Sequence, residues 1–201
     1  MATSFNMLRA NDLIWSFVVN NYLLGKDQLP FDLLFWNSDS TRMPAAMHSF
    51  YLRKMYQENL LARPGGISLA GVPIDLSKIE VPTFILSTRE DHIAPWKSTY
   101  AATHLYSGPL KFVLSASGHM AGVISAPGSK YGHWTNDDLP PTPDEWLAGA
   151  TAHQGSWWPV WDAWISGLDS ERVPARESGG GKLPIIEDAP GSYVRLRAVA
   201  A

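Results

Sequence analysis

Two short apolar runs flank a helix-length segment in the middle of the chain, and this pattern constrains the fold most strongly. The runs are 83–88 (TFILST) and 111–116 (KFVLSA), and the residues from Pro95 to Tyr106 between them have a helical pattern. Parallel strands need a crossover of roughly a dozen residues or more, usually a helix, and its right-handed sense leaves both strand ends at one edge of the sheet. The sequence therefore predicts an α/β fold built on a strand–helix–strand unit.

A carboxylate and an imidazole follow these two runs, Asp91 after the first and His119 after the second. Ligands of open α/β sheets bind outside the carboxyl ends of the strands, so we expect the two side chains to lie side by side in a site. A carboxylate can fix the tautomer of an imidazole that moves a proton between a nucleophile and a leaving group. In α/β-hydrolases the acid and base follow in this order, after a nucleophile on a Gly-x-nucleophile-x-Gly elbow.

Helix capping explains the same spacing equally well. Asp91 would then cap the helix that starts near Pro95, and His119 would cap the next helix along the chain. The spacing alone does not choose between the two interpretations.

Composition excludes several classes of function. The 201 residues include no cysteine, so the chain has no thiol nucleophile, disulfide or zinc–thiolate site, and no Gly-x-Ser-x-Gly elbow offers a substitute. A net charge of −3 gives no basic excess to attract a phosphate backbone, so we expect no nucleic-acid partner. No apolar stretch approaches the length that spans a bilayer, and no secretory leader is present, so we expect a soluble, cytoplasmic protein. The histidines lack metal-ligand spacing with acidic neighbours, and we expect no metal site.

The remaining pattern predicts further helices and a poorly ordered end. A polar residue at Asn11 or Asp12 would cap a well-buried helix that ends near Gly25. The other predicted helices cover 44–61, 144–152 and 156–168, and 67–74 is a short strand or turn. Four tryptophans in or beside the last helix are expected in the core, and the chain from 169 onward is loosely patterned. These tryptophans are Trp157, Trp158, Trp161 and Trp164.

Several sequence strings resemble the polyhydroxyalkanoate synthases, especially the class I type, and the resemblance covers nearly the whole chain. The strings are FNMLRANDLIW at 5–15, PFDLLFWN at 30–37, STREDHIAPW at 87–96, ASGHMAGVI at 116–124, HWTN at 133–136, GSWWP at 155–159 and APGSYV at 189–194.

The resemblance implies the C-terminal part of an α/β-hydrolase fold, with an incomplete sheet, flanking helices and part of a cap. Residues 1–62 would form the end of the cap and the helix after it, 63–168 the C-terminal segment of the hydrolase core, and 169–201 a loosely structured tail. The apolar run at 30–37 would pack in a core or belong to a cover over the site. The elbow cysteine of the family would lie upstream of Met1.

By this resemblance Asp91 and His119 match the family's catalytic aspartate and histidine. His119 would deprotonate the cysteine, and Asp91 would either orient His119 or activate the 3-hydroxyl of the incoming unit. His92 is a candidate to contact substrate, and Arg9 is a candidate to meet the phosphates of coenzyme A.

The family joins (R)-3-hydroxyacyl groups from coenzyme A thioesters into a polyester and needs no resident cofactor. Expected partners are the acyl-CoA, the polyester chain, and a second copy, a full-length synthase or its N-terminal half. The chain alone is expected to be inactive, in the cytoplasm or at the granule surface. The alternative is a non-catalytic module that binds full-length synthase or polymer granules.

Overall fold

The structure is a computed structural model that describes residues 4, 7–8, 10–27 and 43–196. The chain divides into two compact units, one formed by 49–170 and the other by 1–48 with 171–201. Arg9 and the apolar run at 30–37 lie outside the described residues. None of the helices in the described part is both long and apolar enough to cross a membrane.

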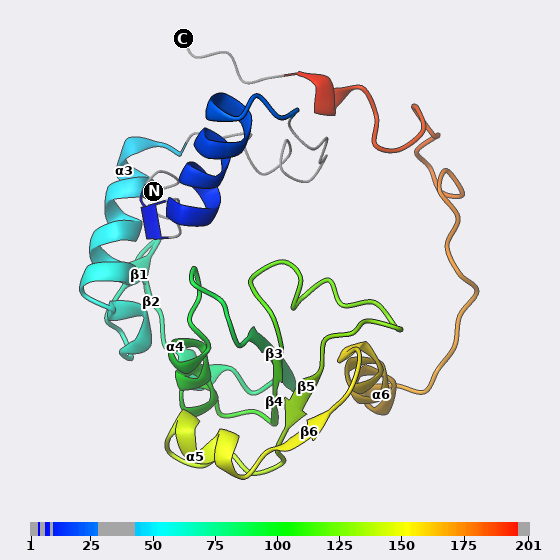
Figure 1. Ribbon diagram of the computed structural model, residues 1–201. Coiled ribbons are helices and arrows are strands. Elements are labelled where there is room, and N and C mark those ends of the chain that lie inside the picture. Colours follow the sequence, from blue (N-terminus) through cyan, green and yellow to red (C-terminus); the bar gives the residue numbers. More distant parts are fainter. Residues whose placement is uncertain (1–3, 5–6, 9, 28–42, 197–201) are drawn as a thin grey trace. The chain divides into compact units, whose positions relative to one another are not determined.

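The unit formed by 49–170 contains the predicted strand–helix–strand motif (Figure 1). Strand β3 (Thr83–Thr88) pairs in parallel with β4 (Leu110–Ser115), and the register runs from Thr83 opposite Leu110 to Thr88 opposite Ser115. The crossover consists of α4 (Trp96–Tyr100) and the 3₁₀ turn η6 (Ala101–His104). The predicted parallel pair and its helical crossover are confirmed.

Two short antiparallel strands extend the sheet in the order β3-β4-β5-β6. They are β5 (His133–Thr135) and β6 (Thr151–His153), and neither was predicted. The helix predicted at 144–152 is wrong at its end, because α5 (Pro143–Ala148) stops at Gly149 and the next residues pair with β5. Strands of three residues are too short to show an alternation of apolar and polar residues, so only their pairing reveals them.

Helices α4 and α5 lie on one face of this sheet (Figure 1). A cluster of aromatic rings from these helices and β4 forms the core there. The ring of Phe112 meets the ring of Trp146 edge-on at 4.8 Å, and Tyr100 meets Phe112 edge-on at 5.1 Å. The hydroxyl of Thr142 accepts a hydrogen bond from the backbone amide of Glu145 in a capping box, which fixes the start of α5. Trp146, the next residue of this helix, is buried in the aromatic cluster.

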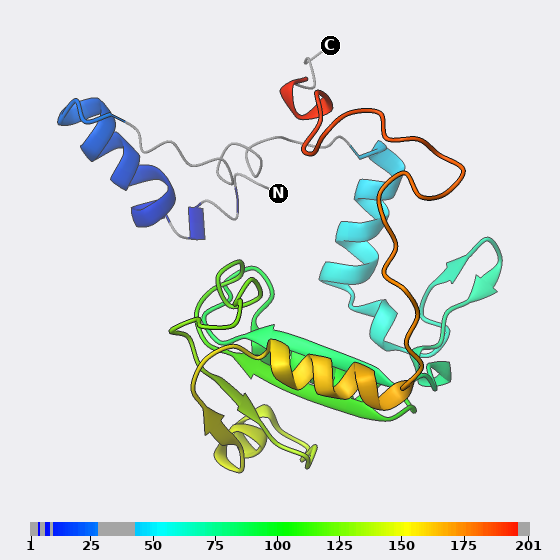
Figure 2. The same cartoon turned by 90° about the vertical axis from the view of Figure 1, so that its right-hand side faces the viewer.

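Helix α6 (Trp158–Leu168) covers the other face of the sheet, beside β3 and β4 (Figure 2). Phe84 of β3 contacts the rings of Trp157 and Trp164, with centroid distances of 6.1 and 5.4 Å. The expectation that all four tryptophans are core residues is wrong, since Trp158 and Trp161 are exposed. In the described part of this unit, the side of α6 that carries Trp158 and Trp161 is open to solvent.

The other described elements are shorter or irregular. The predicted first helix is present as the π-helical segments η1 (Asn11–Trp15) and η2 (Val18–Leu23), and the predicted second helix as α3 (Ala45–Phe50), η3 (Tyr51–Gln57) and η4 (Leu60–Ala62). The described residues also form a hairpin of β1 (Ser68–Leu69) and β2 (Val72–Pro73). Two 3₁₀ turns are η5 (Leu76–Lys78) and η7 (Tyr193–Arg195). The polar cap predicted for the first helix is wrong because Ala10 is already helical, and the predicted burial is wrong because Leu13 and Trp15 are exposed.

His133 links the chain's stability to pH. Its ring is buried, Nδ1 pairs with the carbonyl oxygen of Gly155 at 3.0 Å, and the ring stacks on His153 at 4.9 Å. Burial lowers the pKa of His133 below its ordinary value of 6.5; the hydrogen bond to Gly155 opposes this shift, and the nearby His153 adds to it.

The unfolded chain therefore binds a proton at His133 at a higher pH than the folded chain does. We expect the free energy of unfolding to be constant above pH ~7 and to fall as the pH drops through ~6.5 toward the lower folded pKa. Urea titrations between pH 7.5 and 5.5 measure this slope, and H133N should flatten it. An equal slope in wild type and H133N contradicts the prediction.

Candidate active site

The loops that follow β3 and β4 remain hydrogen-bonded to each other beyond the ends of the strands. The amide of Arg89 donates to the carbonyl of Ser115 at 2.8 Å, and the amide of Glu90 donates to the carbonyl of Ser117 at 3.0 Å. Ser117 has a positive φ of 73°, which turns the second loop. These bonds place the next side chains, Asp91 and His119, side by side at the carboxyl edge of the parallel pair.

Asp91 and His119 form a close pair. Nδ1 of His119 lies 2.7 Å from Oδ2 of Asp91, and the two side chains are 48% and 7% exposed for His119 and Asp91 respectively. Oδ1 of Asp91 accepts hydrogen bonds from the amides of Ile93 at 2.8 Å and Ala94 at 2.9 Å. The hydroxyl of Thr88 donates to Oδ2 at 3.3 Å. Four hydrogen bonds therefore fix the position of the Asp91 carboxylate.

The ionisation of Asp91 decides which nitrogen of His119 can act as a base. Burial raises the pKa of Asp91, but hydrogen bonds from Ala94, His119 and Ile93 outweigh burial and hold the pKa below its ordinary value. An ionised carboxylate only accepts hydrogen bonds, so Nδ1 of His119 must carry the proton of the shared bond. The lone pair of Nε2, on a half-exposed ring, is then free to take a proton.

The capping interpretation is wrong for both residues, because α4 has Pro95 as its N-cap and no side-chain capping hydrogen bond. Oδ1 of Asp91 instead accepts its hydrogen bonds within the turn that leads into α4. In the described part of the chain, the next helix after His119 is α5, whose cap is Thr142. Asp91 thus accepts hydrogen bonds from its own loop on one oxygen and from the imidazole of His119 on the other.

Gly122 is a site residue that the sequence did not single out. It is buried, its amide donates to the carbonyl of Gly118 at 2.9 Å, and a methyl group in its place would lie 2.5 Å from Cγ2 of Thr88. The segment 116–124 after β4, which we call the His119 loop, thus packs directly against the threonine that contacts Asp91. The sequence hint for Gly122 was a glycine three positions after the predicted base, His119. Its close approach to Thr88 could not be predicted, because it depends on the fold.

His92 is partly buried beside the pair, and its Nδ1 atom is buried without a hydrogen-bond partner among the described residues. An unpaired buried nitrogen suits a residue that meets a ligand, but His92 remains a prediction as a substrate contact. Arg9, the residue predicted to meet the phosphates of coenzyme A, lies outside the described residues. Within the described ranges, no three His, Asp or Glu side chains are grouped to hold a metal ion.

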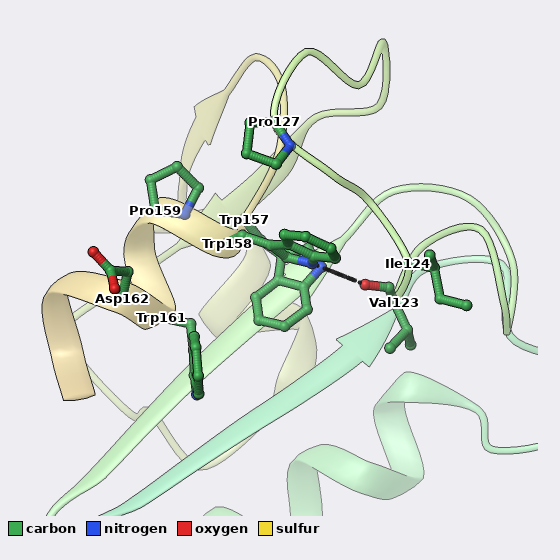
Figure 3. Close-up of a pocket in the computed structure, with 8 residues that line it drawn as sticks. All are labelled: Val123, Ile124, Pro127, Trp157, Trp158, Pro159, Trp161 and Asp162. Atoms are coloured by element: carbon green, nitrogen blue, oxygen red, sulfur yellow. Dashed lines mark hydrogen bonds between the residues drawn. The ribbon is translucent and has the colours of Figure 1, made fainter. Parts of the chain in front are cut away.

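An apolar cavity of about 660 Å³ opens beside the His119 loop (Figure 3). The indole nitrogens of Trp157 and Trp158 donate to the carbonyl of Val123 at 3.2 Å each, which ties α6 to this loop. The remaining residues around the cavity are mostly apolar: Ile124, Pro127, Pro159, Trp161 and Asp162.

The chain is similar to bacterial polyester polymerases along nearly its whole length. It is 50% identical over 200 residues to the poly(3-hydroxyalkanoate) polymerase subunit PhaC of Cupriavidus necator, a match that covers 98% of this chain and 34% of the relative. It is 54% identical over 199 residues to PhaC of Rhizobium meliloti, covering 98% of this chain and 32% of that protein. Poly(3-hydroxyalkanoate) polymerase 1 of Ectopseudomonas oleovorans is 42% identical, with 98% and 35% covered.

These matches confirm the predicted resemblance to the polyhydroxyalkanoate synthases. The chain spans about a third of the length of the curated relatives it matches. No family model matches the chain.

Proposed function

We propose that this chain is the C-terminal part of a poly(3-hydroxyalkanoate) polymerase with an α/β-hydrolase fold and supplies its acid–base pair. The observation that supports this most is the 2.7 Å contact between His119 and Asp91 at the carboxyl edge of two parallel strands. The reaction transfers an (R)-3-hydroxyacyl group from a coenzyme A thioester to a growing polyester and releases coenzyme A.

In this proposal His119 moves the protons of the acyl transfers. Its Nε2 atom removes the proton of a thiol, the thiolate attacks the acyl-CoA thioester, and the coenzyme A thiolate leaves with that proton. His119 next removes the proton of a 3-hydroxyl, whose oxygen attacks the enzyme-bound acyl group. The ester forms as the enzyme thioester bond breaks, and the enzyme thiolate takes that proton back from His119. This chemistry needs no resident cofactor. The thiol comes from another part of the polymerase, because this sequence contains no cysteine.

Between the two roles open for Asp91, its hydrogen bonds favour orientation of His119. Both oxygens already accept two hydrogen bonds each, from Ile93 and Ala94 on Oδ1 and from Thr88 and His119 on Oδ2. Direct activation of a substrate hydroxyl would require one of these donors to leave. We propose that Asp91 holds the Nδ1–H tautomer and stabilises the imidazolium.

The proposal includes further predictions about substrate contacts, domain boundaries and location. His92 would contact the acyl-CoA and Arg9 its phosphates. The boundaries at 62 and 168 would separate the cap, the hydrolase core and the tail. The chain would act in the cytoplasm, at the surface of polyester granules.

A chimera tests the proposal. This chain replaces the matching third of the Cupriavidus necator relative, and release of coenzyme A from (R)-3-hydroxybutyryl-CoA is followed with a thiol reagent. We expect turnover by the chimera and none by the isolated chain. D91N and H119A should each lower kcat of the chimera by about 10²–10⁴-fold, the usual contribution of a positioned acid or base.

D138N is the control, because Asp138 is exposed and follows the end of β5 that runs away from the carboxyl end of β4. Equal activity of D91N, H119A and D138N chimeras would refute the assigned roles. A folded but inactive chimera, with copurification of the chain and full-length synthase, would instead favour the non-catalytic interaction module.

A further inference from the structure

One side of α6 presents a continuous row of exposed apolar side chains. Trp158, Trp161, Ile165 and Leu168 are 37%, 41%, 41% and 51% exposed. Their spacing of three, four and three positions places them on one face of the helix. We call these four residues the α6 stripe.

The side of α6 next to the stripe is also apolar, since Trp157 and Trp164 lie one turn from stripe residues and pack on Phe84 of β3. The apolar part of the helix surface is therefore wider than the part that packs on its own sheet, which is typical of a helix covered by further protein. The α6 stripe therefore has the composition of a buried face but lacks a cover among the described residues of its unit.

The exposed apolar surface continues from the α6 stripe into the His119 loop. Val123 and Ile124 are 43% and 63% exposed, and together with Trp158 and Trp161 they line the 660 Å³ cavity (Figure 3). Asp162 is the one ionisable side chain among the cavity's lining residues. A nearly uncharged wall of this kind suits an apolar protein surface and does not suit a phosphate-bearing ligand.

Strand β3 borders the same region and has an unpaired edge. Within the described residues it pairs with β4 alone. Both of its faces are covered, Phe84 by α6 and Ile85 by the aromatic core, as in an interior strand. The strand has no lysine or proline of the kind that protects natural edge strands.

We infer that the α6 stripe, the adjoining cavity and the open edge of β3 form a docking surface for the other two thirds of a polymerase chain. The relatives supply the argument for this occupant, because they match 98% of this chain and are about three times as long. The inference rests on that resemblance and on exposed surface, and it does not depend on the chemistry proposed for Asp91 and His119.

Thermal unfolding of matched variants tests the inference in the isolated chain and in the Cupriavidus necator chimera described above. W161E should change the Tm of the isolated chain by less than about 3 °C, because Trp161 is exposed there. In the chimera the same substitution should lower Tm by roughly 8 °C or more, since it buries a charge at a docked surface. A163E introduces the same charge at an exposed position outside the stripe on the same helix, and it should leave both values within about 3 °C.

Light scattering of the isolated chain separates this occupant from a second copy. A dimer that W161E dissociates, with no larger Tm loss for W161E than for A163E in the chimera, would overturn the inference in favour of self-association. Equal small effects of W161E and A163E in the chimera, without a dimer, would overturn it as well. A stable but inactive chimera that is sensitive to W161E would support the docking surface and refute only the proposed chemistry.

Discussion

Replacement of Trp146 by alanine is expected to lower the free energy of unfolding by about 3–5 kcal/mol, the usual loss for a large buried aromatic. Trp146 is fully buried, and its ring touches Phe112 edge-on at 4.8 Å and lies 6.1 Å from Tyr100. Truncation leaves a cavity between α5, α4 and β4 that these rings cannot fill without leaving their own packing. Urea unfolding followed by circular dichroism measures the loss.

W146F is the matched variant for this prediction. The buried indole nitrogen of Trp146 has no hydrogen-bond partner among the residues that the structure describes, so phenylalanine removes an unsatisfied donor and keeps most of the ring volume. We expect W146F to lose less than half of what W146A loses. W161A should also lose less than W146A, because Trp161 is 41% exposed. Similar losses in W146A and W161A would show that the aromatic cluster is not the core of this unit.

Substitution of alanine for Gly122 is expected to disturb both stability and the Asp91–His119 pair. The added methyl group would lie 2.5 Å from Cγ2 of Thr88 and 2.7 Å from the carbonyl oxygen of Ala116. Contacts this short force the His119 loop away from β3, at a cost of about 1–3 kcal/mol for an overpacked site. In the Cupriavidus necator chimera, kcat should fall at least tenfold, since a small displacement of a base is costly to its proton transfer.

G167A is the control for Gly122. A methyl group at Gly167, on α6, meets nothing within 4 Å, and alanine in an open helical position is expected to stabilise the chain by up to about 1 kcal/mol. T88S tests the proposed cause, because serine keeps the hydroxyl that contacts Asp91 and removes the Cγ2 methyl group. The double variant T88S/G122A should therefore recover part of the lost stability. No recovery would mean that the clash with Ala116 dominates.

The position of the Asp91–His119 pair was predictable because it follows from two rules that act along the chain. Apolar runs of six residues separated by a helix predict parallel strands, and the handedness of the crossover brings the following residues to one edge. Only the structure excluded the capping alternative for Asp91 and His119, since the ends of a helix are defined by hydrogen bonds that spacing does not report. One oxygen of Asp91 holds the turn before α4 and the other contacts His119.

The sequence by itself determined the parallel pair and the meeting of a carboxylate and an imidazole at its edge, because local periodicity and chain chirality decide both. The tertiary structure decided the pairing of β5 with β6, the proton on Nδ1 of His119 and the tight approach of Gly122 to Thr88. It also divided the tryptophans of α6 between a packed side and an exposed side. These features depend on which residues distant in sequence come into contact, and a single sequence pattern contains no measure of that.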